Sequence, residues 1–242
     1  MGRGIFITGT DTGVGKTLVT AAIVRWLRCR GVDAVPMKPV QTGCTRDGKR
    51  LIAPDLEFCL AASNIKPGEE EMCLMAPYLY GPACSPHLAG RIAGQYPDLS
   101  RIKYCADRLL SMHQVVVTEG AGGIMVPLNE TTTMLDLMRL LAYPVVLVAR
   151  TRLGTINHTL LSIQALRAAG LKLLGIVFNQ AEPSQPENDS VERDNPGTVA
   201  RFSGAVVLGT IRHFERLDPG EAWPNLEEEM PWLHGICDEV GK

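Results

Sequence analysis

The sequence predicts an α/β protein, with a doubly wound, mostly parallel sheet covered by helices on both faces. Six short apolar segments alternate with longer segments whose apolar residues recur three and four positions apart. Short segments that are apolar on both faces are typical of buried parallel strands, and the longer period is typical of amphipathic helices. The alternation runs along the whole chain, so we expect residues 1–242 to form a single domain that binds ligands at the carboxyl ends of its strands.

Each expected strand is a short, mainly apolar run that would be buried on both faces. In chain order the strands are Gly4–Thr8 (GIFIT), Ala34–Met37, Val115–Thr118 (VVVT), Val145–Ala149 (VVLVA), Leu173–Phe178 (LLGIVF) and Val206–Leu208.

Each expected helix carries an apolar stripe with arginine or lysine on the remaining face. The helices are Leu18–Arg30, Leu88–Ala93, Asp98–His113, Met134–Leu141 and Ile156–Ala169. The polar, proline-rich segment Glu182–Gly197 is too long for a simple connection. Its composition leaves two interpretations open, a functional lid or a partly disordered segment.

Charge and cysteine usage narrow the functional class. The chain has 24 Lys plus Arg against 26 Asp plus Glu, so it has no excess of basic residues for a nucleic acid duplex or an anionic membrane. Seven cysteines with no Cys-x-x-Cys pair predict free thiols in a reducing compartment. The first apolar stretch, Ile5–Ile7, is far shorter than a secretion signal. We therefore expect a cytoplasmic protein without nucleic acid or membrane partners.

A phosphate-binding motif follows the first expected strand. Residues 9–17 read GTDTGVGKT, which satisfies G-x-x-x-x-G-K-[ST] and leads into a helix. Glycines let successive backbone N–H groups surround a phosphate, Lys16 can reach the outer phosphates, and the Thr17 hydroxyl can bind Mg²⁺. The sequence therefore predicts a P-loop NTPase that binds a nucleoside triphosphate.

Two charged residues at strand ends are candidate partners for this motif. Glu119 follows VVVT and precedes Gly120–Gly123, where small residues allow the backbone to approach a ligand closely. Lys38 ends the second strand and would point toward the same crevice. Taken alone, each residue could also be a solvent-exposed charge.

Further motifs make the chain resemble the dethiobiotin synthetase family. After GTDTGVGKT come Lys38-Pro39-Val40 with Thr42-Gly43, Asp55, Ser85-Pro86-His87, EGAGG at 119–123, LGTINH at 153–158 and Asn179, in the order and spacing of that family. The resemblance implies an ATP-dependent ligase that joins diaminopelargonic acid and CO₂ into the ureido ring of dethiobiotin, releasing ADP and phosphate. A carbamate and then a carbamic-phosphoric mixed anhydride would be the intermediates.

The resemblance also implies roles for individual residues. The nucleotide would be bound by Gly13, Val14, Gly15, Lys16, Thr17, Leu18, Asp55, Glu119, Gly120, Ala121, Gly122, Asn179, Gln180, Arg212, His213 and Phe214. Magnesium would be held, directly or through water, by Thr17, Asp55 and Glu119. Lys16 and Lys38 would be the catalytic cations. The substrate would be contacted by Thr12, Lys38 and Thr42, and its carboxylate by Gly154, Thr155 and Asn157 across a two-fold homodimer interface.

One residue departs from the family pattern, and three others have a structural explanation that does not need the resemblance. Arg212 stands where the family usually has proline, so the base-binding segment is expected to have a different backbone. Asp55 follows Pro54 and, without the resemblance, would be interpreted as a helix N-cap. His87 and His158 are interpreted as structural. The alternative function is a P-loop switch or partitioning ATPase, which would not require Lys38, Thr42 and LGTINH together.

Overall fold

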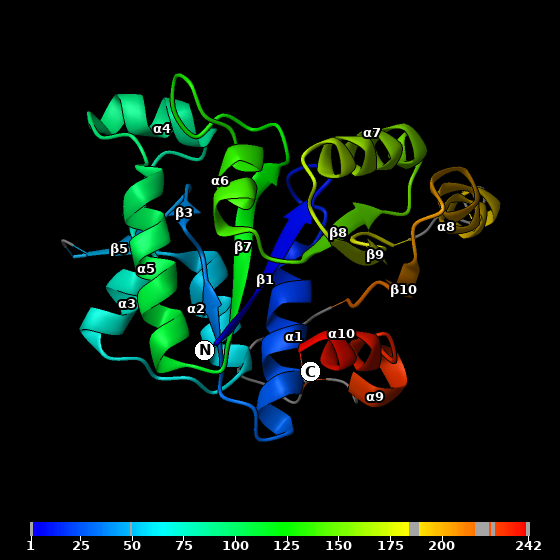
Figure 1. Ribbon diagram of the computed structural model, residues 1–242, viewed down its shortest axis with the longest axis horizontal. Coiled ribbons are helices and arrows are strands. Elements are labelled where there is room, and N and C mark those ends of the chain that lie inside the picture. The colour runs from blue at the N-terminus through cyan, green and yellow to red at the C-terminus, as the bar shows by residue number, and fades with distance from the viewer. Residues whose placement is uncertain (1, 49, 184–188, 216–222, 224–225, 241–242) are drawn as a thin grey trace.

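The computed structural model describes residues 2–48, 50–183, 189–215, 223 and 226–240. Its main sheet has six strands in the order β10-β9-β8-β1-β7-β2, and every neighbouring pair is parallel (Figure 1). The strands are β1 (Arg3–Gly9), β2 (Ala34–Met37), β7 (Val115–Gly123), β8 (Val145–Arg150), β9 (Leu173–Asn179) and β10 (Val207–Ile211). The predicted doubly wound parallel sheet is confirmed.

Helices cover both faces of this sheet (Figure 1). One face packs against α1 (Lys16–Cys29), α9 (Leu226–Glu229) and α10 (Leu233–Val240), and the other against α5 (Leu99–Met112), α6 (Met134–Leu141), α7 (Thr155–Ala168) and α8 (Asp189–Ser203). Within β1, Ile5 and Ile7 join the core beneath α1, whereas Phe6 joins the core on the opposite face. This alternation explains why the strands are apolar at every position.

The region between β2 and α5 contains several elements that were not predicted. They are β3 (Val40–Gln41), β4 (Thr45–Asp47), β5 (Arg50–Ile52), α2 (Pro54–Ala62), α3 (Glu69–Met75) and β6 (Tyr78–Leu79), followed by the expected α4 (Pro86–Ala93). β3 pairs with β6 in parallel, and β4 pairs with β5 as an antiparallel hairpin. Strands of two or three residues are too short to show a periodic pattern, so the sequence gives no signal for them.

Element boundaries differ from the prediction at several places, including the start of α1 and the end of β7. α1 begins at Lys16 rather than Leu18, because Gly15 at the N-cap turns the chain with a φ of 100° and the first helical residues are polar. β7 continues beyond Thr118 to Gly123, because small residues let it run beside the start of the P-loop. The N-cap interpretation of Asp55 is wrong: Ala53 is the N-cap, and Pro54 and Asp55 form the first turn of α2.

The polar segment Glu182–Gly197 is largely helical where it is described. Its residues from 189 onward belong to α8, while residues 184–188 lie outside the described residues. The helix is anchored by polar contacts: Glu192 accepts a hydrogen bond from the Thr151 hydroxyl (2.7 Å), and the Asn195 amide donates to the Thr151 carbonyl (2.6 Å). Of the two interpretations left open for this segment, partial disorder does not describe residues 189–197, which are helical and held by buried polar contacts. Among the described helices, none combines the length and apolarity needed to span a membrane.

Candidate active site

The P-loop lies between the carboxyl end of β1 and the first turn of α1. Gly13 and Gly15 have φ values of 72° and 100°, a left-handed conformation that favours glycine. A Cβ atom at Gly15 would lie 2.0 Å from the Asn179 amide nitrogen, so this position has no room for a side chain. The loop conformation thus explains two glycines of the motif by backbone geometry and close packing.

A cavity of about 730 Å³ opens beside the P-loop at the carboxyl ends of β1, β2 and β7. Of the predicted site residues, it is lined by Thr12, Gly13, Gly15, Lys16, Thr17, Lys38, Thr42, Asp55, Glu119, Ala121 and Gly122. Sequence reasoning missed Gln41 and Cys84, which also line it. For Gln41 the available signal was its position between Lys38 and Thr42, two residues already assigned to the site.

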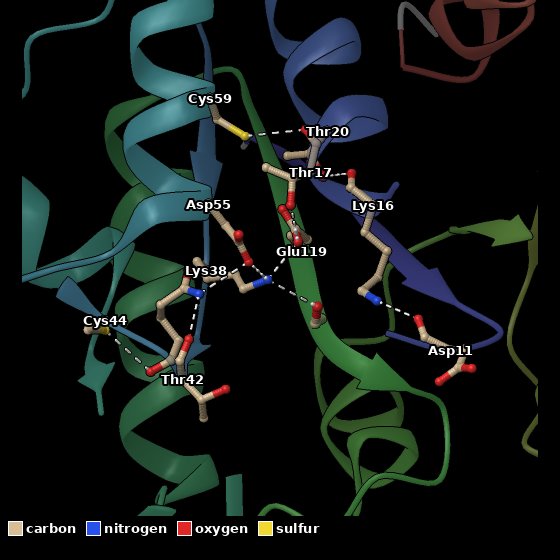
Figure 2. A network of polar contacts seen from close by, with 12 residues as sticks. Asp11, Lys16, Thr17, Thr20, Lys38, Thr42, Cys44, Asp55, Cys59 and Glu119 are labelled. Carbon is tan, nitrogen blue, oxygen red and sulfur yellow. Dashed lines mark hydrogen bonds and ion pairs between the residues drawn. The ribbon is translucent and has the colours of Figure 1, made fainter. Parts of the chain in front are cut away.

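Lys38 is the centre of a buried charge cluster in this cavity (Figure 2). Its Nζ lies 2.6 Å from Asp55 Oδ2 and 2.6 Å from Glu119 Oε1. Glu119 Oε1 also accepts a hydrogen bond from the Thr17 hydroxyl at 3.0 Å. Two carboxylates, from α2 and β7, therefore meet around a single ammonium group, and the Thr17 hydroxyl of α1 contacts one of them.

The protonation of this cluster follows from its charges. Burial alone would lower the pKa of Lys38, but the carboxylates of Glu119 and Asp55 outweigh it and raise that pKa above its ordinary value. Burial would raise the pKa of Asp55, and the Lys38 ammonium reverses this and lowers it. The pair is therefore held in its charged form.

Lys16 points away from the cluster (Figure 2), and its Nζ donates to the Asp11 carbonyl at 2.8 Å. Only 6% of this residue is exposed. Burial, aided by the nearby Lys38 charge, lowers the pKa of Lys16 from 10.5 to about 8. A phosphate group placed at the loop would supply the negative charge that this ammonium lacks.

The oxygen atoms around Lys38 fit a magnesium ion. Mg²⁺ takes hard oxygen ligands and, at nucleotide sites, is usually held by one or two carboxylates together with phosphates and water. Asp55, Glu119 and Thr17 offer that set, and their oxygens already converge on a cation. Within the described part of the chain no cluster of three His, Cys, Asp or Glu side chains forms a metal site by itself. Phosphate oxygens and water would complete the coordination of such an ion.

The residues expected to surround the nucleotide base lie outside this cavity. The Asn179 amide donates to the Val14 carbonyl at 3.0 Å, and Asn179 lines a smaller hollow of about 270 Å³ beside Thr12 and Gly13. The Gln180 N–H bonds the Ile211 carbonyl at 2.9 Å, which brings the ends of β9 and β10 together. After Ile211 the chain leaves the sheet through Arg212, His213 and Phe214, and Arg212 forms an ion pair with Glu229 of α9.

The residues expected at the substrate carboxylate form the start of α7. Gly154 is the N-cap with a φ of 91°, and Thr155 is buried with its hydroxyl 3.3 Å from that of Thr159. Asn157 is exposed, and none of these residues lines the large cavity. Within one copy of the chain, the structure therefore does not bring this group together with Lys38 and Thr42.

The chain is similar to known proteins over most of its length. A family model described as an AAA domain matches residues 3–221. The ATP-dependent dethiobiotin synthetase BioD of Anaeromyxobacter sp. (strain Fw109-5) is 42% identical over 219 residues, which cover 87% of this chain and 90% of the relative. The protein of the same name from Halalkalibacterium halodurans is 40% identical over 210 residues, covering 86% of this chain and 84% of the relative.

Among solved structures, the septum site-determining protein MinD complexed with Mg-ADP from Pyrococcus horikoshii OT3 has a TM-score of 0.61 and 17% identity. The alignment covers 100% of this chain and 97% of that chain. At this identity the likeness concerns the fold, which is of the predicted P-loop NTPase type.

Proposed function

The chain belongs to the AAA-domain family and, within it, to the dethiobiotin synthetases, and from this premise we propose that it forms dethiobiotin from diaminopelargonic acid, CO₂ and ATP. The observation that carries the proposal is the charge cluster beside the P-loop, in which buried Lys38 pairs with buried Glu119 and with the partly exposed Asp55. A switch ATPase needs the loop and one acidic residue. It has no need for Lys38 together with Thr42 and the LGTINH segment at 153–158.

The phosphate groups of ATP would lie over the P-loop. Backbone N–H groups of residues 13–18 would surround them, with the Lys16 ammonium beside the transferred phosphoryl group. Thr17, Asp55 and Glu119 would hold Mg²⁺, which supplies positive charge to the phosphate oxygens. The small residues Gly120, Ala121 and Gly122 leave space for the phosphates to approach β7.

The reaction itself requires charge neutralisation and positioning rather than a protein nucleophile. One amine of the diamine attacks CO₂ and loses a proton to give a carbamate, whose oxygen then attacks the γ-phosphorus and expels ADP. The second amine attacks the carbonyl carbon of the mixed anhydride, and the carbon–oxygen bond to phosphate breaks as the ring closes. Lys38 would stabilise the anionic carbamate and anhydride, while Thr12 and Thr42 orient the diamine.

The base of the nucleotide would lie where β9 and β10 end. Asn179 and Gln180 on one side, and Arg212, His213 and Phe214 on the other, are joined there by the hydrogen bond from Gln180 to Ile211. The ion pair between Arg212 and Glu229 would fix this segment in place of the proline ring expected from the resemblance.

The enzyme would act as a two-fold homodimer that holds the substrate carboxylate at the start of the partner's α7. Support comes from the exposed residues Gly154 and Asn157, and from Leu153 and Leu161, which are 89% and 62% exposed. Light scattering should give twice the monomer mass of 26.3 kDa, and Leu153→Glu should shift the protein toward monomer. A monomer that retains full activity would contradict this arrangement.

We further assign the enzyme to the cytoplasm, because ATP and CO₂ are available there and the six cysteines whose side chains are described are free thiols.

Product analysis tests the proposed function directly. Purified protein is incubated with diaminopelargonic acid, bicarbonate, ATP and Mg²⁺, and both dethiobiotin and phosphate are measured. We expect one dethiobiotin for each phosphate released, and little phosphate release when the diamine is omitted. Phosphate release that is independent of the diamine would instead support the partitioning ATPase.

A further inference from the structure

Gln41 is a buried glutamine at the end of β3, and only 4% of it is exposed. Its Nε2 donates to the Thr42 carbonyl at 3.0 Å and to Asp55 Oδ2 at 3.2 Å. Both partners are acceptors, so they fix which end of the amide faces them. One side chain therefore holds the backbone of Thr42 and the carboxylate of Asp55 at the same time.

The other end of the amide has no partner in the described part of the chain. Gln41 Oε1 is buried there without a hydrogen bond. An unpaired buried acceptor costs stability, so this end of the amide does not stabilise the fold. The two N–H bonds to Thr42 and Asp55 are therefore what glutamine adds at this position.

Asp55 Oδ2 is shared by two donors with different charges. Lys38 Nζ lies 2.6 Å away and Gln41 Nε2 lies 3.2 Å away. A metal ion bound between Asp55 and Glu119 would compete with the Lys38 ammonium for the same place, because two cations repel each other strongly at that distance. When the ammonium leaves, the hydrogen bond from Gln41 can remain, because it is neutral.

We propose that Gln41 is a positioning residue of the metal site, which keeps the Asp55 carboxylate oriented when the Lys38 ammonium gives way to Mg²⁺. Partners that orient a metal-binding carboxylate commonly affect metal affinity by tenfold or more. Because Gln41 also holds the Thr42 carbonyl, it connects the metal site to the segment that would orient the diamine. The inference rests on the proposed function, in that it assumes a metal-bound nucleotide in this cavity.

Metal binding to the full chain tests this role without the ligase reaction. Binding of Mn²⁺ to the ADP-bound protein is followed by electron paramagnetic resonance in wild type and in Gln41→Met. We expect Gln41→Met to weaken Mn²⁺ binding by about tenfold. ADP binding in the presence of a chelator should stay unchanged, because the P-loop is intact. The thermal midpoint of the metal-free protein is measured alongside, to show that the variant is folded.

Two further variants serve as controls. Gln41→Leu, a second apolar replacement, should show the same loss of Mn²⁺ affinity, so the test does not depend on one variant folding. Gln114→Met removes the hydrogen bond that Gln114 Oε1 accepts from the Asp33 N–H at 2.8 Å, at the opposite edge of the sheet, and should leave Mn²⁺ binding unchanged.

Activity adds a separate readout. In Gln41→Met, the Mg²⁺ concentration for half-maximal dethiobiotin formation should rise. Unchanged Mn²⁺ affinity in both Gln41 variants would overturn the inference, and so would an equal loss of metal-free ADP binding. If wild type forms no dethiobiotin but the Mn²⁺ shift appears, the proposed function fails and the positioning role stands.

Discussion

The two edges of the parallel sheet carry hollows of similar size but different chemistry. The hollow at the carboxyl edge measures about 730 Å³ and contains Lys16, Lys38 and Glu119, which are 6%, 4% and 2% exposed. The hollow at the amino edge is larger, about 820 Å³, and its charged groups lie near the surface. Volume therefore does not distinguish the candidate active site; the burial of opposite charges around one point does.

The charges at the amino edge have a structural explanation. The two ring nitrogens of His113 lie 2.9 Å from Asp33 and 3.0 Å from Glu71, and the carboxylate side chains are 47% and 20% exposed. These contacts join the end of α5 to the residue before β2 and to α3. Solvent partly screens the contact with Asp33, so it can connect elements at a lower desolvation cost than the buried pair of Lys38 and Glu119.

Lys16→Ala should have the largest effect, because it removes the cation expected beside the transferred phosphoryl group. We expect turnover to fall at least about a thousandfold, as is typical when a cation of a phosphoryl-transfer site is lost. Far-UV circular dichroism should stay unchanged, since the side chain faces a cavity. Normal turnover in this variant would contradict the assignment of residues 9–17 as the phosphate-binding loop of the active site.

Lys38→Gln should lower the rate of ring closure at least about a hundredfold. ATP should still bind, because the loop and Lys16 hold the phosphates independently. The variant also removes the ammonium between Asp55 and Glu119, so its affinity for Mn²⁺ in the presence of ADP should rise rather than fall. Equal losses of ring closure and of nucleotide binding would contradict separate roles for the two lysines.

The pKa of Lys16 predicts a smaller, pH-dependent effect at the carboxyl edge. Between about 8 and its ordinary 10.5, the buried amine has lost its proton in the nucleotide-free protein. An anionic phosphate favours the ammonium, so nucleotide binding in this range should take up a proton. Calorimetry in two buffers of different ionisation enthalpy should detect the uptake above pH 8 and not well below it. Equal proton uptake above pH 8 and well below it would contradict the lowered pKa of Lys16.

The smallest effect on activity is expected at the amino edge. His113→Gln should reduce the free energy of unfolding by about 1 kcal/mol, because the contact with Asp33 is half exposed and screened. Dethiobiotin formation at saturating substrates should stay at the wild-type level. Denaturant unfolding and the product assay check the two halves of this prediction. A large loss of activity without loss of stability would show that the amino edge takes part in the reaction. It would contradict the assignment of the active site to the carboxyl edge alone.

The sequence could predict those site residues whose function depends on neighbours in the chain, but not those that depend on distant residues. The P-loop was predictable because phosphate binding uses consecutive residues, and Gly13 to Thr17 are adjacent in the chain. Glu119 was predictable as the acidic residue of an apolar strand, although the strand continues past it. Asp55 was not, because its partner Lys38 belongs to another element and an aspartate after Pro54 has a simpler local explanation.

Residues 40–79 and the base-binding segment show a different limit. The two-residue strands β3 and β6 exist because they pair with each other, and that pairing is what places Gln41 beside Asp55. Arg212 is paired with Glu229, a contact across 17 positions that no local pattern indicates. Such positions are defined by tertiary contacts, so propensity and periodicity cannot identify them.

The most direct test of the central claim follows the oxygen atoms of CO₂. If the carbamate attacks ATP and the second amine then expels phosphate, one oxygen of CO₂ leaves with that phosphate. The protein is therefore incubated with diaminopelargonic acid, ATP and heavy-oxygen-labelled bicarbonate, and the phosphate is analysed by mass spectrometry. The account predicts one labelled oxygen in each phosphate released with dethiobiotin. Phosphate that carries oxygen from water alone would show simple ATP hydrolysis and would contradict the account.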